Sequence, residues 1–113
     1  MECLFCKIVK KEIPSKIVFE NEQILAFKDI DPKAPVHVLI IPKKHIAGIN
    51  DITADDNELL GKLLNSAKEI AAKEKIDKGG YRLVINNGKD AGQAVDHIHV
   101  HLLGGRKLSW PPG

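Results

Sequence analysis

Hydrophobic and polar residues alternate along several short stretches of the chain, a pattern typical of strands that bury one face. The clearest case is DHIHVHLL at residues 96–103, where three histidines alternate with isoleucine, valine and leucine. A strand would place His97, His99 and His101 on one face and the apolar residues on the other. A helix would spread the same three side chains around its axis. The pattern therefore predicts a strand that packs its apolar face and offers a row of imidazoles.

Four more strands and two helices are expected from the same kind of pattern. The strands are predicted at residues 16–20, 24–30, 36–42 and 81–86. A short helix is predicted from Cys3 to Pro14. A long helix is predicted from the capping pair Thr53 and Asp56 to about Lys75, with apolar residues at helical spacing: Leu59, Leu60, Leu63, Leu64, Ala67, Ile70 and Ala71. This order predicts an α+β fold with helices laid on a five-stranded antiparallel sheet.

Length and composition restrict the classes of protein to consider. At 113 residues the chain is expected to form one domain, residues 1–113. The formal net charge of +2 is too small to require nucleic acid as a partner. The longest apolar run, residues 38–41, is far too short to span a membrane. The first residues lack the pattern of a secretory signal, so a cytoplasmic location is expected.

The histidine row is suited to two functions: nucleophilic catalysis at phosphorus and metal binding. A neutral imidazole is a good nucleophile, and a neighbouring one can carry a proton near neutral pH. The glycine-rich stretch NNGKDAGQ, residues 86–93, precedes the row and is expected to cradle a phosphate through exposed backbone N–H groups. Two histidines at positions i and i+2 can also bind one cation, so a metal-dependent hydrolase is an alternative.

Cys3 and Cys6 form a C-x₂-C pair near the N-terminus. In a reducing compartment such a pair favours metal binding or catalysis over a disulfide. A redox-active pair usually follows the strand of a βαβ unit, and no strand is predicted before this one. Zinc is therefore favoured, with two histidines from later in the chain completing a tetrahedral set. Spacing alone does not say which histidines these are.

The stretch HIHVHLL at residues 97–103 resembles the signature of the histidine-triad (HIT) family, and the resemblance extends over nearly the whole chain. CLFCKIVKKEIP resembles part of the family's N-terminal half. The ending GGRKLSWPPG is similar to the Hint branch rather than to the fragile-histidine-triad branch or the galactose-1-phosphate uridylyltransferases. The resemblance implies the HIT fold, a homodimer, and a phosphoramidase that hydrolyses adenosine and guanosine 5'-monophosphoramidates and aminoacyl adenylates. Its ligands would be purine nucleoside monophosphate derivatives, with no catalytic cofactor.

The resemblance also implies a role for particular residues. His99 would be the nucleophile that forms a covalent nucleotidyl-histidine, and the other catalytic histidines would be His101, His37 and His97. The nucleotide site would consist of Phe5, Ile8, Phe27, Asp29, Ile30, Asn86, Gly92, Gln93, His99 and His101. A structural zinc ion would be held by Cys3, Cys6, His45 and His97. If zinc binds His97, the general-acid role passes to His101 or His37.

Two residues depart from the pattern of the Hint branch. Ala94 stands where many Hint proteins carry a serine, so one hydroxyl near the phosphate is missing. Asp96 replaces an aromatic residue of animal relatives and is expected to face away from the histidine row. The alternative functions are a dinucleoside polyphosphate hydrolase and a zinc-stabilised nucleotide-binding or scaffold protein.

Overall fold

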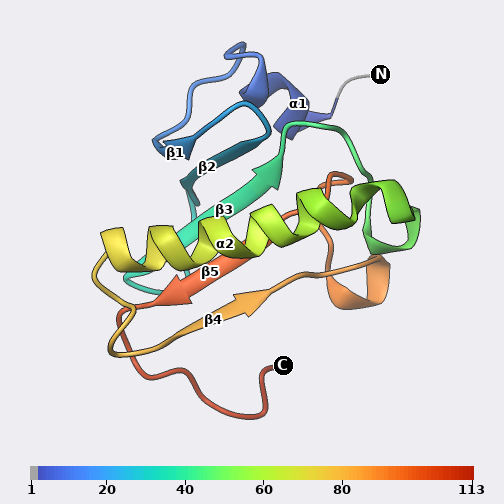
Figure 1. Cartoon of the computed structure of the whole chain (residues 1–113). Coiled ribbons are helices and arrows are strands. Elements are labelled where there is room, and N and C mark those ends of the chain that lie inside the picture. The colour runs from blue at the N-terminus through green and yellow to red at the C-terminus, as the bar shows by residue number, and fades with distance from the viewer. Residues whose placement is uncertain (1–2) are drawn as a thin grey trace.

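The computed structural model describes residues 3–113 and contains one antiparallel sheet with a long helix across one face (Figure 1). The strands are β1 (Ile17–Glu20), β2 (Ile24–Lys28), β3 (Val36–Pro42), β4 (Tyr81–Val84) and β5 (Val100–Gly104). Their order in the sheet is β1-β2-β3-β5-β4. The helices are α1 (Leu4–Val9) and α2 (Asn57–Lys73), with 3₁₀ turns at Ile49–Asp51, Ala54–Asp56 and Lys89–Ala91. The predicted α+β fold, with five antiparallel strands, one long helix and one short helix, is confirmed.

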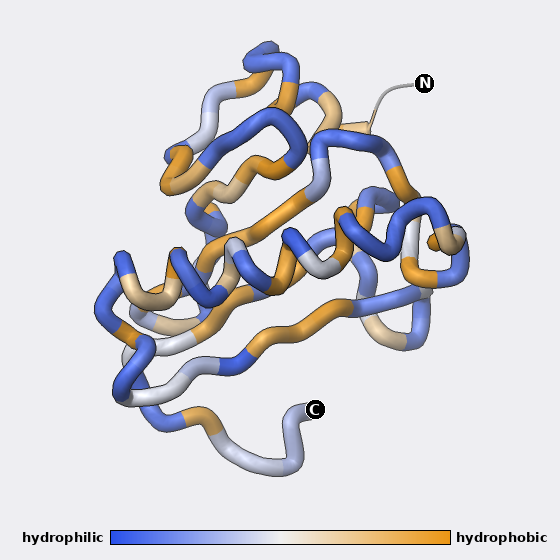
Figure 2. Tube along the Cα trace, in the orientation of Figure 1, coloured by the Kyte–Doolittle hydropathy of each residue, from blue (hydrophilic) through white to orange (hydrophobic). Residues whose placement is uncertain are grey.

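The sheet separates two apolar clusters, because neighbouring residues of a strand point to opposite faces. The larger cluster joins the sheet to α2 and includes Ile24, Val38, Ile40, Val100, Leu102, Leu63 and Ile70. The smaller cluster joins the opposite face to α1 and consists of Phe5, Ile8, Leu25, Phe27, Leu39 and Ile41. In Figure 2 apolar positions follow the central strands, whereas α2 alternates between apolar and polar positions. His37 of β3 alternates with Val38, so it lies on the α1 face of the sheet.

The histidine row is only partly a strand, which differs from the prediction. β5 begins at Val100, so His97 and His99 precede it. In the register of β3 and β5, Pro42 would face Ile98 and form the next hydrogen-bonded pair after Ile40 and Val100. Proline has no N–H to donate, so the ladder ends there. The Ile98 N–H instead donates to the Ile46 carbonyl at 2.7 Å. The predicted alternation still holds in the packing, because Ile98, Val100 and Leu102 all join the α2 cluster.

The long helix begins one short turn later than its capping signal. Thr53 and Asp56 form a capping box, with the Thr53 N–H donating to Asp56 Oδ2 at 3.0 Å. The box closes the 3₁₀ turn, and α2 continues from Asn57. Leu64, predicted on the apolar side of the helix, has 54% of its surface exposed. Within residues 3–113, no helix has both the length and the apolar character needed to span a membrane.

Candidate active site and metal centre

Two cysteines and two histidines meet at the start of α1: Cys3, Cys6, His45 and His97. Cys3 Sγ lies 3.5 Å from His45 Nδ1 and 3.3 Å from His97 Nδ1. Cys6 Sγ lies 3.3 Å and 3.7 Å from the same two nitrogens, which are themselves 3.2 Å apart. The two histidines therefore turn the same ring nitrogen toward both sulfur atoms.

These separations fit zinc. A tetrahedral zinc ion with ordinary bond lengths separates its sulfur and nitrogen ligands by about 3.6 Å and two nitrogen ligands by about 3.3 Å. Burial and the adjacent Cys3 thiol raise the pKa of Cys6 above its ordinary value. A divalent cation between the sulfur atoms would supply the positive charge that holds both as thiolates. The four residues would bind zinc through two thiolates and two Nδ1 atoms.

His97 is fully buried, and both of its ring nitrogens have partners. Its Nε2 lies 2.7 Å from the Pro42 carbonyl oxygen, so Nε2–H is the donor and Nδ1 keeps the lone pair that faces Cys3 and Cys6. A backbone carbonyl on the distal nitrogen is a common way to orient a metal-binding imidazole. With both nitrogens committed in this way, His97 has no proton to deliver to a substrate.

His99 is held in one orientation and one tautomer. Its Nδ1 lies 2.7 Å from the His97 carbonyl oxygen, so Nδ1–H donates and Nε2 carries the lone pair. The Phe5 ring packs edge-on against it, with centroids 5.1 Å apart and an interplanar angle of 87°. The His101 ring lies on another side with its centroid at 5.0 Å. A neutral His99 therefore presents an unprotonated Nε2, the form of imidazole that acts as a nucleophile.

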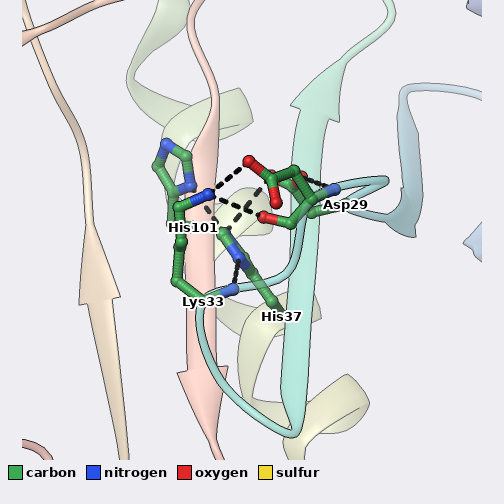
Figure 3. Close-up of polar contacts among 5 residues, drawn as sticks. Asp29, Lys33, His37 and His101 are labelled. Atoms are coloured by element: carbon green, nitrogen blue, oxygen red, sulfur yellow. Dashed lines mark hydrogen bonds and ion pairs between the residues drawn. The ribbon is translucent and has the colours of Figure 1, made fainter.

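His37 and His101 form a second histidine pair, which Figure 3 shows beside Asp29 and Lys33. His37 Nε2 lies 2.9 Å from His101 Nδ1 and 3.4 Å from Asp29 Oδ2. Burial lowers the pKa of His37. Burial, followed by the charges of His99 and His37, lowers the pKa of His101 to about 4. Both imidazoles are therefore neutral at pH 7.

Asp29, His37 and His101 are close enough to suggest a second metal site, but their hydrogen bonds argue against one. The backbone N–H of Lys33 donates to His37 Nδ1 at 3.1 Å. Because Nδ1 already accepts this hydrogen, a neutral His37 carries its own proton on Nε2. A cation in this cluster would have to displace that proton and leave an imidazolate. The cluster is better suited to hydrogen bonding than to metal binding.

The predicted nucleoside-binding residues divide into buried and exposed positions. Phe5, Ile8 and Phe27 are at most 6% exposed, and the Phe5 and Phe27 rings meet edge-on at 5.5 Å. Ile30 is completely exposed. A hollow of about 610 Å³ adjoins this region, and it is lined by Pro14, Ser15, Lys16, Lys28, Asp29, Ile30 and Pro32. Asp29 thus borders the hollow and also contacts His37.

The glycine-rich loop uses its hydrogen-bonding groups differently from the prediction. The Gly92 N–H donates to the Lys89 carbonyl at 3.0 Å and the Gln93 N–H to the Gly88 carbonyl at 3.1 Å. These two donors stabilise the loop itself, so the structure directs them to backbone carbonyls of the loop rather than to a ligand. The Gln93 side chain also braces the loop, accepting from Gly88 N at 2.9 Å and donating to the Ala47 carbonyl at 2.7 Å. Asn86 is half-buried at the start of the loop.

Three functional groups of this region are backbone atoms, which side-chain patterns do not identify. The carbonyl of Pro42 fixes the tautomer of His97, and the carbonyl of His97 fixes that of His99. The N–H of Lys33 fixes the tautomer of His37. Every residue carries a carbonyl and nearly every residue an N–H, so no side-chain pattern marks them.

Comparison with known proteins shows the family. The HIT domain model matches residues 10–108, and the chain belongs to the HIT family. The crystal structure of a HIT family hydrolase from Legionella pneumophila has a TM-score of 0.98 and 59% identity, over 99% of this chain and 100% of that chain. The crystal structure of a histidine triad nucleotide-binding protein from Candida albicans has a TM-score of 0.83 and 39% identity, over 97% of this chain and 83% of that chain.

A relative from Zea mays, a 14 kDa zinc-binding protein, is 53% identical over 112 residues, which cover 97% of this chain and 87% of that protein. The family predicted from the histidine row is confirmed, and the chain has the fold shared by HIT family hydrolases and nucleotide-binding proteins. The Cys3, Cys6, His45 and His97 cluster is consistent with zinc binding.

Proposed function

We propose that the protein is a purine nucleoside phosphoramidase of the Hint branch, with residues 1–113 acting as one HIT domain. The observation that carries the proposal is the hydrogen bond from His99 Nδ1–H to the His97 carbonyl, which leaves an unprotonated Nε2 in a buried site. The substrates would be adenosine or guanosine monophosphate joined to an amine, and also aminoacyl adenylates, in which the leaving group is a carboxylate instead of an amine.

In the proposed reaction His99 Nε2 attacks the phosphorus atom and forms a nucleotidyl-histidine. The phosphorus–nitrogen bond to the amine breaks, and the amine leaves with the bonding electrons and takes up a proton. Water then attacks the same phosphorus, which releases the nucleoside monophosphate and restores His99. Dividing the displacement into two steps lowers each barrier.

His101 and His37 would assist as neutral groups. Burial keeps His101 uncharged at pH 7, so it would donate a hydrogen bond to the phosphoryl group rather than act as a strong acid. The proton for the departing amine would then come from water. His97 contributes its backbone carbonyl, which orients His99, while its side chain belongs to the metal centre.

The nucleoside would bind in the hollow lined by Asp29 and Ile30. Asp29 would accept hydrogen bonds from the ribose hydroxyls, and Ile30 would cover the base. Phe5, Ile8 and Phe27 would support the base from below. They belong to one packed apolar cluster, so their side chains would not need to move when the nucleoside binds. Among the loop residues, Gln93 and Gly92 would act mainly by holding the loop in shape beside the phosphate, together with Asn86.

A fluorogenic amine joined to AMP tests the activity, with a diadenosine polyphosphate as the competing substrate. We expect kcat/KM for the phosphoramidate to exceed that for the polyphosphate by at least about 100-fold, a difference of roughly 3 kcal/mol in transition-state stabilisation. Faster hydrolysis of the polyphosphate would assign the protein to that hydrolase class instead. Turnover of neither, with tight AMP binding, would favour the zinc-stabilised binding or scaffold protein.

We also propose that the protein is a symmetric homodimer. β4 is an edge strand, and exposed apolar residues lie on it, just after it and on α2: Tyr81, Ile85 and Leu64. An isologous contact through this edge would bury them and protect the edge from other pairing.

Sedimentation of the protein at micromolar concentration should show a dimer, and Leu64→Lys should weaken it. The control is Ile17→Lys, which charges the other edge of the sheet and should leave the dimer intact. A wild-type monomer would contradict the proposal.

A further inference from the structure

The loop between β2 and β3 holds His37 through the main chain rather than through a side chain. Lys33 N–H donates to His37 Nδ1 at 3.1 Å, as Figure 3 shows. The loop is fixed at its base by the Asp29 N–H, which donates to the His37 carbonyl at 3.0 Å, and by the Asp31 N–H, which donates to Asp29 Oδ1 at 2.8 Å. The Lys33 amide is therefore aimed at His37 by a short, braced connection.

This one hydrogen bond determines the tautomers of two histidines. With Nδ1 accepting from Lys33, a neutral His37 must carry its proton on Nε2. That Nε2–H lies 2.9 Å from His101 Nδ1, which must then accept, so a neutral His101 carries its proton on Nε2. The opposite arrangement would require a proton on His37 Nδ1, directed against the Lys33 N–H.

We propose that the backbone amide of Lys33 is a positioning group that makes His101 a hydrogen-bond donor at Nε2, beside the unprotonated Nε2 of the nucleophile His99. The inference rests on the proposed function, because it assigns the donor to the phosphoryl group of a nucleotide. When both imidazoles are neutral, His99 supplies a lone pair and His101 supplies a proton, so the two neighbours have complementary roles.

The charged groups around the pair are compatible with this arrangement. Asp29, at the end of β2, lies 3.4 Å from His37 Nε2 and attracts the same proton, which favours the same tautomer. The ammonium group of Lys33 is paired with Asp31. Lys28 and Glu74, the latter just after α2, line a second and smaller hollow of about 120 Å³ together with His37. From the β5 side the neighbouring titratable group is His99.

Lys33→Pro and Lys33→Ala form a matched pair that tests the amide. Proline removes the backbone N–H, whereas alanine keeps it and removes only the ammonium group. ¹⁵N NMR of histidine-labelled protein at pH 7.5 should show Nε2–H on His37 and His101 in the wild type and in Lys33→Ala. In Lys33→Pro, both residues should populate the Nδ1–H form, and kcat for the phosphoramidate should fall by at least about tenfold.

The pH profile tests the same assignment. Because burial lowers the pKa of His101 to about 4, His101 stays mostly neutral between pH 8 and pH 5 in the wild type and in Lys33→Pro alike. The loss of kcat in Lys33→Pro relative to Lys33→Ala should therefore stay constant over this range, and a loss that disappeared toward pH 5 would contradict the role of the tautomer.

Several results would overturn the inference. They are a wild-type His37 with its proton on Nδ1, unchanged tautomers in Lys33→Pro, or an equal loss of activity in Lys33→Ala. If Lys33→Pro does not fold, the NMR spectrum of the wild type remains the test, because a proton on Nδ1 of His37 would contradict the inference. A wild type with the expected tautomers and no phosphoramidase turnover would contradict the proposed function, whereas good turnover with the wrong tautomers would contradict only the role of Lys33.

Discussion

His99→Ala should lower kcat for an adenosine phosphoramidate by at least about a thousandfold, because loss of a covalent nucleophile removes the reaction path itself. AMP should still bind, since the hollow beside Asp29 and Ile30 is lined by other residues. Steady-state kinetics and calorimetric titration with AMP measure the two properties separately. Acid quenching of the wild type during turnover should also yield a protein heavier by one nucleotidyl group.

Asp96→Ala is a suitable control, because Asp96 is an exposed neighbour of the histidine row. It should keep kcat within about twofold of the wild type, as surface substitutions usually do. If His99→Ala kept more than about a tenth of the wild-type kcat, or still formed the heavier species, another residue would be the nucleophile. Loss of AMP binding together with turnover would instead point to damage of the whole site.

Side-chain patterning was enough to predict the strands of the sheet and the helix that covers it, but not the order of the strands. Strict alternation in HIHVHLL places isoleucine, valine and leucine in the α2 cluster, and the helical spacing of Leu59, Leu63, Ala67 and Ile70 identifies the covering helix. These predictions succeed because burying apolar surface is the main driving force for folding and acts on side chains. Leu64 shows the limit of the method, since periodicity alone did not distinguish the centre of the apolar face from its margin.

The local geometry of the site depends on main-chain groups and was harder to predict. Pro42 ends the ladder with β5 and frees its carbonyl for His97, so the residue that shortens the predicted strand also orients a metal-centre histidine. The family resemblance implied that Gln93 lies at the nucleotide, but its side-chain amide is bonded to Gly88 and Ala47. Whether a polar side chain binds a ligand or another part of the protein depends on distances in the folded structure. Sequence patterns do not give those distances.

The metal centre should contribute strongly to stability, because it ties the start of α1 to the segment before β5. Cys3→Ser combined with Cys6→Ser should lower the free energy of unfolding by about 2–4 kcal/mol, less than a zinc-finger peptide loses because this chain has its own core. For a chain of this size that corresponds to a fall in Tm of roughly ten degrees or more. Thermal unfolding and elemental analysis of protein purified without chelator measure the effect and the expected one zinc per subunit.

The same change should affect catalysis only modestly. Two thiolates and two imidazoles fill a tetrahedral zinc site, so no position remains for substrate or water. The centre nevertheless adjoins the active site, because the His97 carbonyl orients His99 and Phe5, between the two cysteines in sequence, packs against the same ring. We expect kcat to fall severalfold, compared with the thousandfold loss in His99→Ala.

Chelator provides the control that separates zinc from the substitutions themselves. Treating the wild type with chelator should lower its Tm to that of the double variant, whereas the double variant should not respond. An additive response, in which chelator lowers both Tm values equally, would mean that any zinc binds elsewhere. Less than about a tenth of an equivalent of zinc, together with unchanged stability of the double variant, would leave Cys3 and Cys6 as ordinary half-buried thiols, with Cys3 packed against the smaller apolar cluster.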